Sequence, residues 1–111
     1  MLERGSGAVL FALGTSARQV APALASSAVP QAGLLAHARN LDASVRPRGV
    51  AVGALLIGGL ITGSAAAGLF DQGRFEGVED GVLPRLDPDD LAGRLILMAR
   101  PDGPAEVEIT G

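Results

Sequence analysis

Three aspartates near the C-terminus have a spacing that could bind a cation. Asp87, Asp89 and Asp90 supply carboxylates at short intervals, as a calcium-binding loop does. Such a loop also needs a glycine near its middle and a glutamate at its twelfth position, where this chain has Met98. An aspartate followed by proline is instead typical of a helix start, because the aspartate caps free backbone amides. We therefore expect Asp87 to be a helix cap and predict no metal site.

Nucleophilic and acid–base catalysis are not indicated by any pattern in the chain. There is no cysteine, so thiolate nucleophiles, thiolate metal ligands and disulfides are excluded. His37 is the only histidine, and no carboxylate lies within one helical turn of it. Five serines lack the glycine-flanked turn that exposes a nucleophile, namely Ser16, Ser26, Ser27, Ser44 and Ser64. We predict no catalytic residue and no enzymatic activity.

Residues 54–67, ALLIGGLITGSAAA, resemble the strand, glycine turn and helix with which flavin- and nicotinamide-binding Rossmann proteins begin. In this resemblance Gly58 is the first glycine of the motif and Gly63 is the last. The middle glycine lets the backbone approach the pyrophosphate of the dinucleotide, and Leu60 occupies that position here. Because a leucine side chain would block the approach, we predict no bound cofactor.

The small residues of this region also have the spacing of a helix-packing motif. Residues four apart lie on one face of a helix, and small side chains there let a neighbouring backbone come close. Gly59, Gly63 and Ala67 form one set with this spacing, and Ser64 and Gly68 form a second. We predict that these residues form a helix-packing interface.

The longest apolar run, Val50 to Phe70, contains no charged residue. A helix of this length would extend about 31 Å, close to the roughly 30 Å thickness of a bilayer core. The run therefore predicts a single transmembrane helix over 50–70. Arg46 and Arg48 precede it and Asp71 follows it, which favours a cytoplasmic N-terminus in a bacterial inner membrane.

The two flanking segments differ in character. Residues 1–49 predict short helices kinked at Pro22 and Pro30, and residues 71–111 predict an acidic arm followed by a small C-terminal region. Residues 88–92 are expected to form one helical turn. Beyond it the sequence fits either a continued helix or a β-hairpin, and we favour the hairpin. The predicted fold class is thus mainly α, with segments 1–49, 50–70 and 71–111.

Charge and composition limit the function. The net charge is −3, and the chain has no tryptophan or tyrosine to stack on bases, so nucleic acid is not an expected partner. All nine basic residues are arginine, which is typical of a GC-rich bacterial genome. We expect a non-catalytic accessory or structural subunit of a membrane complex, in contact with lipid and with other membrane subunits or copies of itself. The alternative is a soluble structural subunit of a homo-oligomeric particle, for example a virion component, with the Gly/Ala-rich run buried between subunits.

Overall fold

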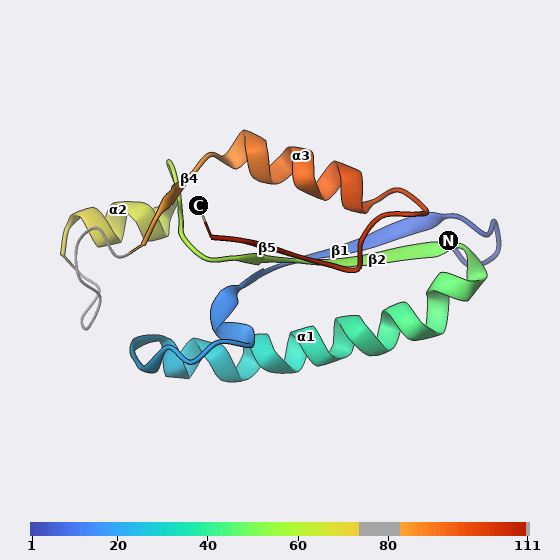
Figure 1. Cartoon of the computed structure of the whole chain (residues 1–111), viewed down its shortest axis with the longest axis horizontal. Helices are drawn as coiled ribbons and strands as arrows, with labels where there is room; N and C mark the ends of the chain where they lie inside the picture. The colour runs from blue at the N-terminus through green and yellow to red at the C-terminus, as the bar shows by residue number, and fades with distance from the viewer. Residues whose placement is uncertain (74–82, 111) are drawn as a thin grey trace.

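Three parallel strands form the central sheet of the molecule (Figure 1). The computed structural model describes residues 1–73 and 83–110. The strands lie in the order β1 (Gly7–Gly14), β2 (Val50–Ile57) and β5 (Glu106–Ile109), so that β2 is central. Each of the three segments 1–49, 50–70 and 71–111 supplies one of these strands.

Helices α1 (Ala25–Val45) and α3 (Pro88–Met98) cover the two faces of this sheet (Figure 1). A second, smaller sheet of two short parallel strands lies near helix α2. The remaining elements are η1 (Thr15–Ala17), η2 (Pro22–Leu24), η3 (Arg46–Arg48), β3 (Leu60–Ile61), α2 (Ala65–Asp71) and β4 (Arg85–Leu86).

The apolar run that suggested a membrane span is divided between several elements. Its first eight residues are β2, whose first seven residues are buried. A strand covered on both faces has no need for alternating polar residues and therefore shows a continuous apolar pattern. Gly58 and Gly59 end the strand, and Gly63 turns the chain before α2. Of the helices in residues 1–73 and 83–110, none is long and apolar enough to cross a membrane. The predicted transmembrane helix over 50–70 is therefore wrong. The predicted mainly α fold class is also wrong, because β1, β2 and β5 form a parallel sheet.

The N-terminal segment also differs from the prediction of short kinked helices. Residues 7–14 are the strand β1, which pairs with the whole length of β2. Pro22 begins η2, but Pro30 lies inside α1 without ending it. Pro30 is the sixth residue of α1, so its missing N–H removes only one backbone bond near the start of a 21-residue helix.

The C-terminal region is a helix and a strand, where the sequence favoured a hairpin. Asp87 caps α3, and its carboxylate accepts a hydrogen bond of 3.0 Å from the amide of Asp89. The helix continues to Met98 because Leu91, Leu95 and Met98 place apolar side chains on one face, against the sheet. The strand β5 pairs in parallel with β2 and not with residues 94–100. Residues 74–82 of the expected acidic arm lie outside the described part of the chain.

Alternate residues of β2 face the two helices. Val52, Ala54 and Leu56 pack against α1, whereas Leu55 packs on the face covered by α3. The strands are added to the sheet in chain order and in one direction, so two right-handed crossovers would place both helices on the same face. Because α1 and α3 lie on opposite faces, the two crossovers have opposite hands and one of them is left-handed (Figure 1).

Candidate functional site

The chain leaves the sheet in two directions at the carboxyl ends of β1 and β2. Gly14 and Ile57 are paired at these ends. After Gly14 the chain passes through η1 and η2 into α1 on one face, and after Ile57 it passes through β3 and α2 toward α3 on the other. In open α/β sheets a crevice forms where neighbouring strands send their connections to opposite faces, and ligands bind there. This position is the geometric candidate for a site.

A cavity of about 280 Å³ occupies this position. It will be called the carboxyl-edge cleft. Its lining comes from the ends of β1 and β2, from η1 and α1 on one side, and from β3 and α2 on the other. The described lining residues are Gly14, Thr15, Ser16, Leu24, Ser27, Gln31, Ile57, Gly58, Gly59, Leu60, Ala66 and Leu83. None of them is charged at neutral pH, and none is a histidine or a carboxylate, so they supply no side-chain ligand of the kinds that usually hold a metal.

The polar groups of the cleft are hydroxyls and one carboxamide. The backbone N–H of Gly14 donates a hydrogen bond to Oε1 of Gln31, which joins the end of β1 to α1. The Ser27 hydroxyl donates to the carbonyl oxygen of Leu24 at 3.0 Å. Ser27 and Gln31 are four residues apart and so lie on the same face of α1. Together with Thr15 and Ser16 they can donate or accept hydrogen bonds without carrying charge.

Two glycines let the walls of the cleft come together. A Cβ atom at Gly58 would lie 3.0 Å from the methyl carbon of Thr15, and one at Gly59 would lie 2.5 Å from the carbonyl oxygen of Pro84. The strand pair β3 and β4 therefore approaches the end of β2 at Gly59 without room for a side chain. The close contact between the walls of the cleft therefore depends on the absence of side chains at Gly58 and Gly59.

The structure separates the five small residues predicted as a helix-packing interface. Gly59 lines the cleft, and Gly63 has a φ of +83° in the turn before α2. Ser64 caps α2 by accepting a hydrogen bond of 3.1 Å from the amide of Ala67, which is buried. Gly68 lies in α2. No single helix face presents all five residues, since two of them precede α2 and a third is its cap.

The residues expected to flank a membrane span take part in contacts within the chain. Arg46 donates to Asp42 at 2.6 Å and to the carbonyl oxygen of Val52 at 2.9 Å, which joins the end of α1 to β2. Arg48 is exposed in η3, and Asp71 accepts a hydrogen bond from Arg85. These contacts connect neighbouring elements of the fold.

The sequence pattern predicts no role for Thr15 or Gln31. It indicates for Ser16 and Ser27 only that they lack the turn that exposes a nucleophile. The available signal was the pair of small hydroxyl residues directly after Gly14, at the end of an apolar segment. That signal indicates a binding site only if residues 7–14 form a strand beside β2. Ser27 and Gln31 reach the cleft through the placement of α1, which the sequence pattern does not give.

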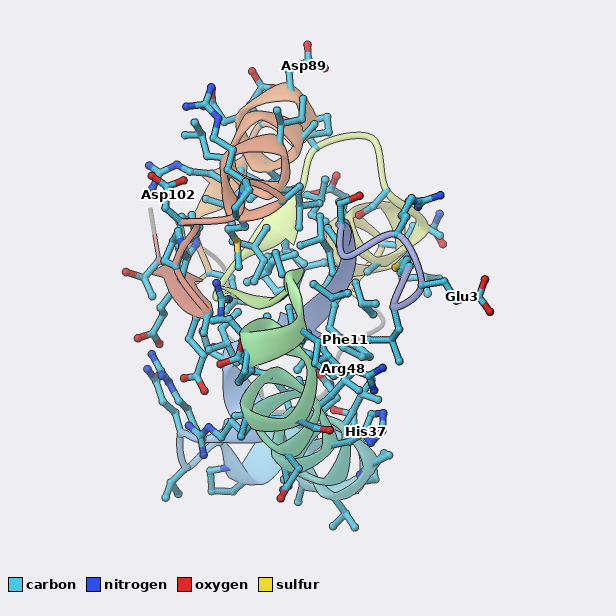
Figure 2. The ribbon with its side chains drawn as sticks, turned by 90° about the vertical axis from the view of Figure 1, so that its right-hand side faces the viewer. Glu3, Phe11, His37, Arg48, Asp89 and Asp102 are labelled. Atoms are coloured by element: carbon cyan, nitrogen blue, oxygen red, sulfur yellow. The ribbon has the colours of Figure 1, made fainter. Side chains whose placement is uncertain are left out.

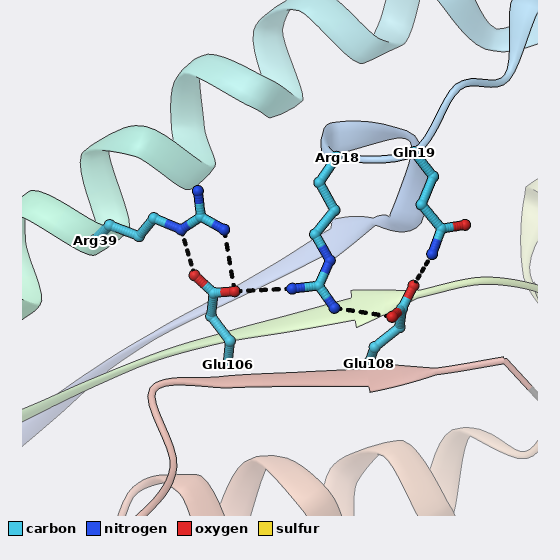
Figure 3. A network of polar contacts seen from close by, with 5 residues as sticks. All are labelled: Arg18, Gln19, Arg39, Glu106 and Glu108. Carbon is cyan, nitrogen blue, oxygen red and sulfur yellow. Dashed lines mark hydrogen bonds and ion pairs between the residues drawn. The ribbon is translucent and has the colours of Figure 1, made fainter.

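A network of charged side chains supports the wall of the cleft (Figure 3). Arg18, just after η1, donates to Glu106 at 3.0 Å and to Glu108 at 2.8 Å, both on β5. Arg39 of α1 also binds Glu106, and Gln19 donates to Glu108. The hydrogen bond from Arg39 is the main reason that the pKa of Glu106 is lowered from its usual value. The network thus fixes the η1 side of the cleft against β5.

Acid should weaken this network. Because the pKa of Glu106 is lower in the folded chain, its contribution to stability is complete above the usual carboxyl pKa and is lost as the pH falls through the lowered value. Replacing Glu106 with glutamine should therefore reduce the unfolding free energy more at about pH 7 than at about pH 3. Urea denaturation at both pH values measures this, with Glu3→Gln at the exposed N-terminus as the control. An effect of Glu106→Gln that is the same at both pH values would contradict the assignment.

Comparison of the sequence with protein-family models and with curated proteins finds no match.

Proposed function

We propose that the chain is a non-catalytic binding module that holds a small, uncharged organic molecule in the carboxyl-edge cleft. The observation that carries this proposal is the position of the cavity. It lies where two neighbouring parallel strands send their connections to opposite faces of the sheet, which is the place where open α/β sheets bind ligands. The volume of about 280 Å³ suits a small molecule of one ring.

The lining supports a neutral ligand with an apolar body. Leu24, Ile57, Leu60 and Leu83 supply aliphatic walls. A charged group would lose its hydration on entering, and no charged side chain of the described lining would compensate for that loss. Hydroxyl and carboxamide groups can instead pair with a ligand amide, carbonyl or hydroxyl. The favoured ligand is therefore a flat, apolar ring that carries one neutral hydrogen-bonding group.

The side chains of the cleft support binding more than catalysis. Activation of a hydroxyl nucleophile needs an adjacent base, and the described lining contains neither a histidine nor a carboxylate. The only histidine, His37, packs edge-on against Phe11 with ring centroids 6.0 Å apart and does not line the cleft. Thr15, Ser16 and Ser27 are therefore proposed as binding groups.

Titration with benzamide tests the proposal. This probe joins an apolar ring to one neutral carboxamide. For a ligand of about nine heavy atoms, we expect a dissociation constant on the order of 1 mM. Benzoate and benzamidine have nearly the same shape but carry charge, so they should bind at least about tenfold more weakly. Ligand-observed NMR measures all three. Equal affinity for the neutral and the charged probes would contradict the proposed chemistry of the cleft.

A pair of neighbouring alanines on α2 provides the matched variants. Ala66 lines the cleft and is exposed, so Ala66→Phe should fill the cavity without disturbing the core. Ala65 is also exposed but does not line the cleft. We expect Ala66→Phe to abolish measurable benzamide binding and Ala65→Phe to leave it unchanged. Loss of binding in both variants, or in neither, would place the ligand elsewhere.

A further inference from the structure

Strand β1 forms one edge of the central sheet, and its own residues carry no charge. Within residues 1–73 and 83–110, strand β1 pairs with β2 on one side and has no strand partner on the other. None of its eight residues is charged, and only Leu13 is buried, whereas the neighbouring β2 is almost completely buried. A long, uncharged edge strand presents a row of backbone groups to which another strand can bind.

The opposite edge of the sheet is different. Strand β5 has only four residues, and two of them are Glu106 and Glu108, which bind Arg18 and Arg39 (Figure 3). A short edge strand with charged side chains is a common protection against pairing with another sheet. In the described part of the chain, charged side chains thus protect the β5 edge, and no strand pairs with the outer side of β1.

Helix α1 carries an uncharged stripe beside the β1 edge. Pro30, Leu34, His37 and Leu41 are spaced by four, three and four residues, so they lie on one side of α1. The contact between Phe11 of β1 and His37 places this stripe on the β1 side of the helix. Figure 2 shows both residues on the side of the molecule that carries Glu3, away from Asp102. Leu34 is 40% exposed there.

We propose that the free edge of β1 is an interface with a second copy of this chain, in which the two β1 strands pair in antiparallel orientation across a two-fold axis. The two three-stranded sheets would then form one continuous sheet of six strands, with the two α1 stripes on the same face.

A second copy fits this edge for two reasons. A two-fold axis brings a strand against itself, and a strand without charges meets no like charge in that arrangement. The chain carries a net charge of −3, so two copies repel each other less along an uncharged strand than along a charged one such as β5.

The test is the mass of the chain in solution, measured by light scattering after size-exclusion chromatography. The unsubstituted chain should reach twice the 11.1 kDa mass of one copy at concentrations between about 10 µM and about 1 mM. Ala12 is the exposed residue of β1. Ala12→Lys should return the chain to the mass of one copy at the same concentrations, because it places a charge on the pairing edge. Ala36→Lys, at an exposed position of α1 outside the stripe, should remain dimeric.

A second variant separates loss of pairing from loss of folding. Leu34→Glu introduces charge into the stripe at an exposed helix position, and circular dichroism shows whether each variant keeps its fold. Folded, single-copy Leu34→Glu together with dimeric Ala36→Lys would support the interface. A mass of one copy for the unsubstituted chain over the whole range would overturn the proposal. Dimers that persist in both Ala12→Lys and Leu34→Glu would also overturn it. This interface does not depend on ligand binding, which Ala12→Lys should leave unchanged.

Discussion

Replacing Leu56 with alanine should lower the unfolding free energy by about 2–5 kcal/mol. Leu56 lies in the central strand β2 and is 0% exposed. Its side chain belongs to the cluster between the sheet and α1, with Leu13, Leu35 and Ala38. Truncation would remove buried apolar surface and leave a cavity that a close-packed core fills poorly. Chemical denaturation followed by circular dichroism measures the loss.

Ile96→Ala is the matched control for this prediction. Ile96 lies in α3 and is 67% exposed, so its truncation should change the unfolding free energy by no more than about 0.5 kcal/mol. Comparable losses at Leu56 and Ile96 would be inconsistent with β2 as the buried centre of the sheet.

Replacing Gly49 with alanine should also destabilise the chain, by more than about 2 kcal/mol. Gly49 ends η3 directly before β2 and has a φ of +88°, a left-handed conformation that is unfavourable for alanine. A Cβ atom at this position would also overlap the backbone carbonyl of Gly5. The substitution should therefore disturb the start of β2 and the segment that leads into β1. Thermal denaturation of the purified variant provides the measurement.

Gly33→Ala should act in the opposite direction. Gly33 lies inside α1, and a Cβ atom there would meet no atom within 4 Å. Alanine favours the helix over glycine, so a gain of about 0.5–1 kcal/mol is expected. If both glycine variants lost stability to the same extent, the special backbone role assigned to Gly49 would be wrong.

The buried strand β2 explains why the fold was difficult to predict from the sequence. An apolar run without charge fits a membrane helix, and it equally fits a strand covered on both faces. The spacing of the glycines in this run predicts helix packing. In the structure Gly59 follows the strand and Gly63 makes a turn with positive φ. A break at Gly58 and Gly59 leaves the eight-residue segment Val50–Ile57, which is the length of a strand and too short for a span.

The local sequence predicts the C-terminal region better than it predicts β2. Asp87 and Pro88 signalled a helix start, and a helix begins there. The sequence predicts a helix only over 88–92, because the segment 94–100 is also rich in residues that form strands. Packing of Leu91 and Met98 against the sheet decides in favour of the helix, and that packing partner is not visible in the local sequence.

The candidate site depends even more on contacts between distant segments. Thr15 and Gln31 reach one cleft with Gly59 only because β1 lies beside β2 and α1 packs across both strands. The order of strands in the sheet is a tertiary property, and one of the two crossovers has the less common hand. The residue types alone indicate uncharged hydrogen-bonding groups, but they do not show which of these groups lie together in one cleft.

The most direct test of the central claim is to map benzamide onto the backbone amides by NMR of the isotopically labelled chain. Binding in the carboxyl-edge cleft predicts concentration-dependent shifts at Thr15, Ser16 and Gly59, which line it. The amides of Arg94 and Leu95 in the middle of α3, which do not line the cleft, should be unchanged. Saturable shifts confined to the cleft are the expected result. The absence of shifts at those three residues, or equal shifts along α3, would contradict the account.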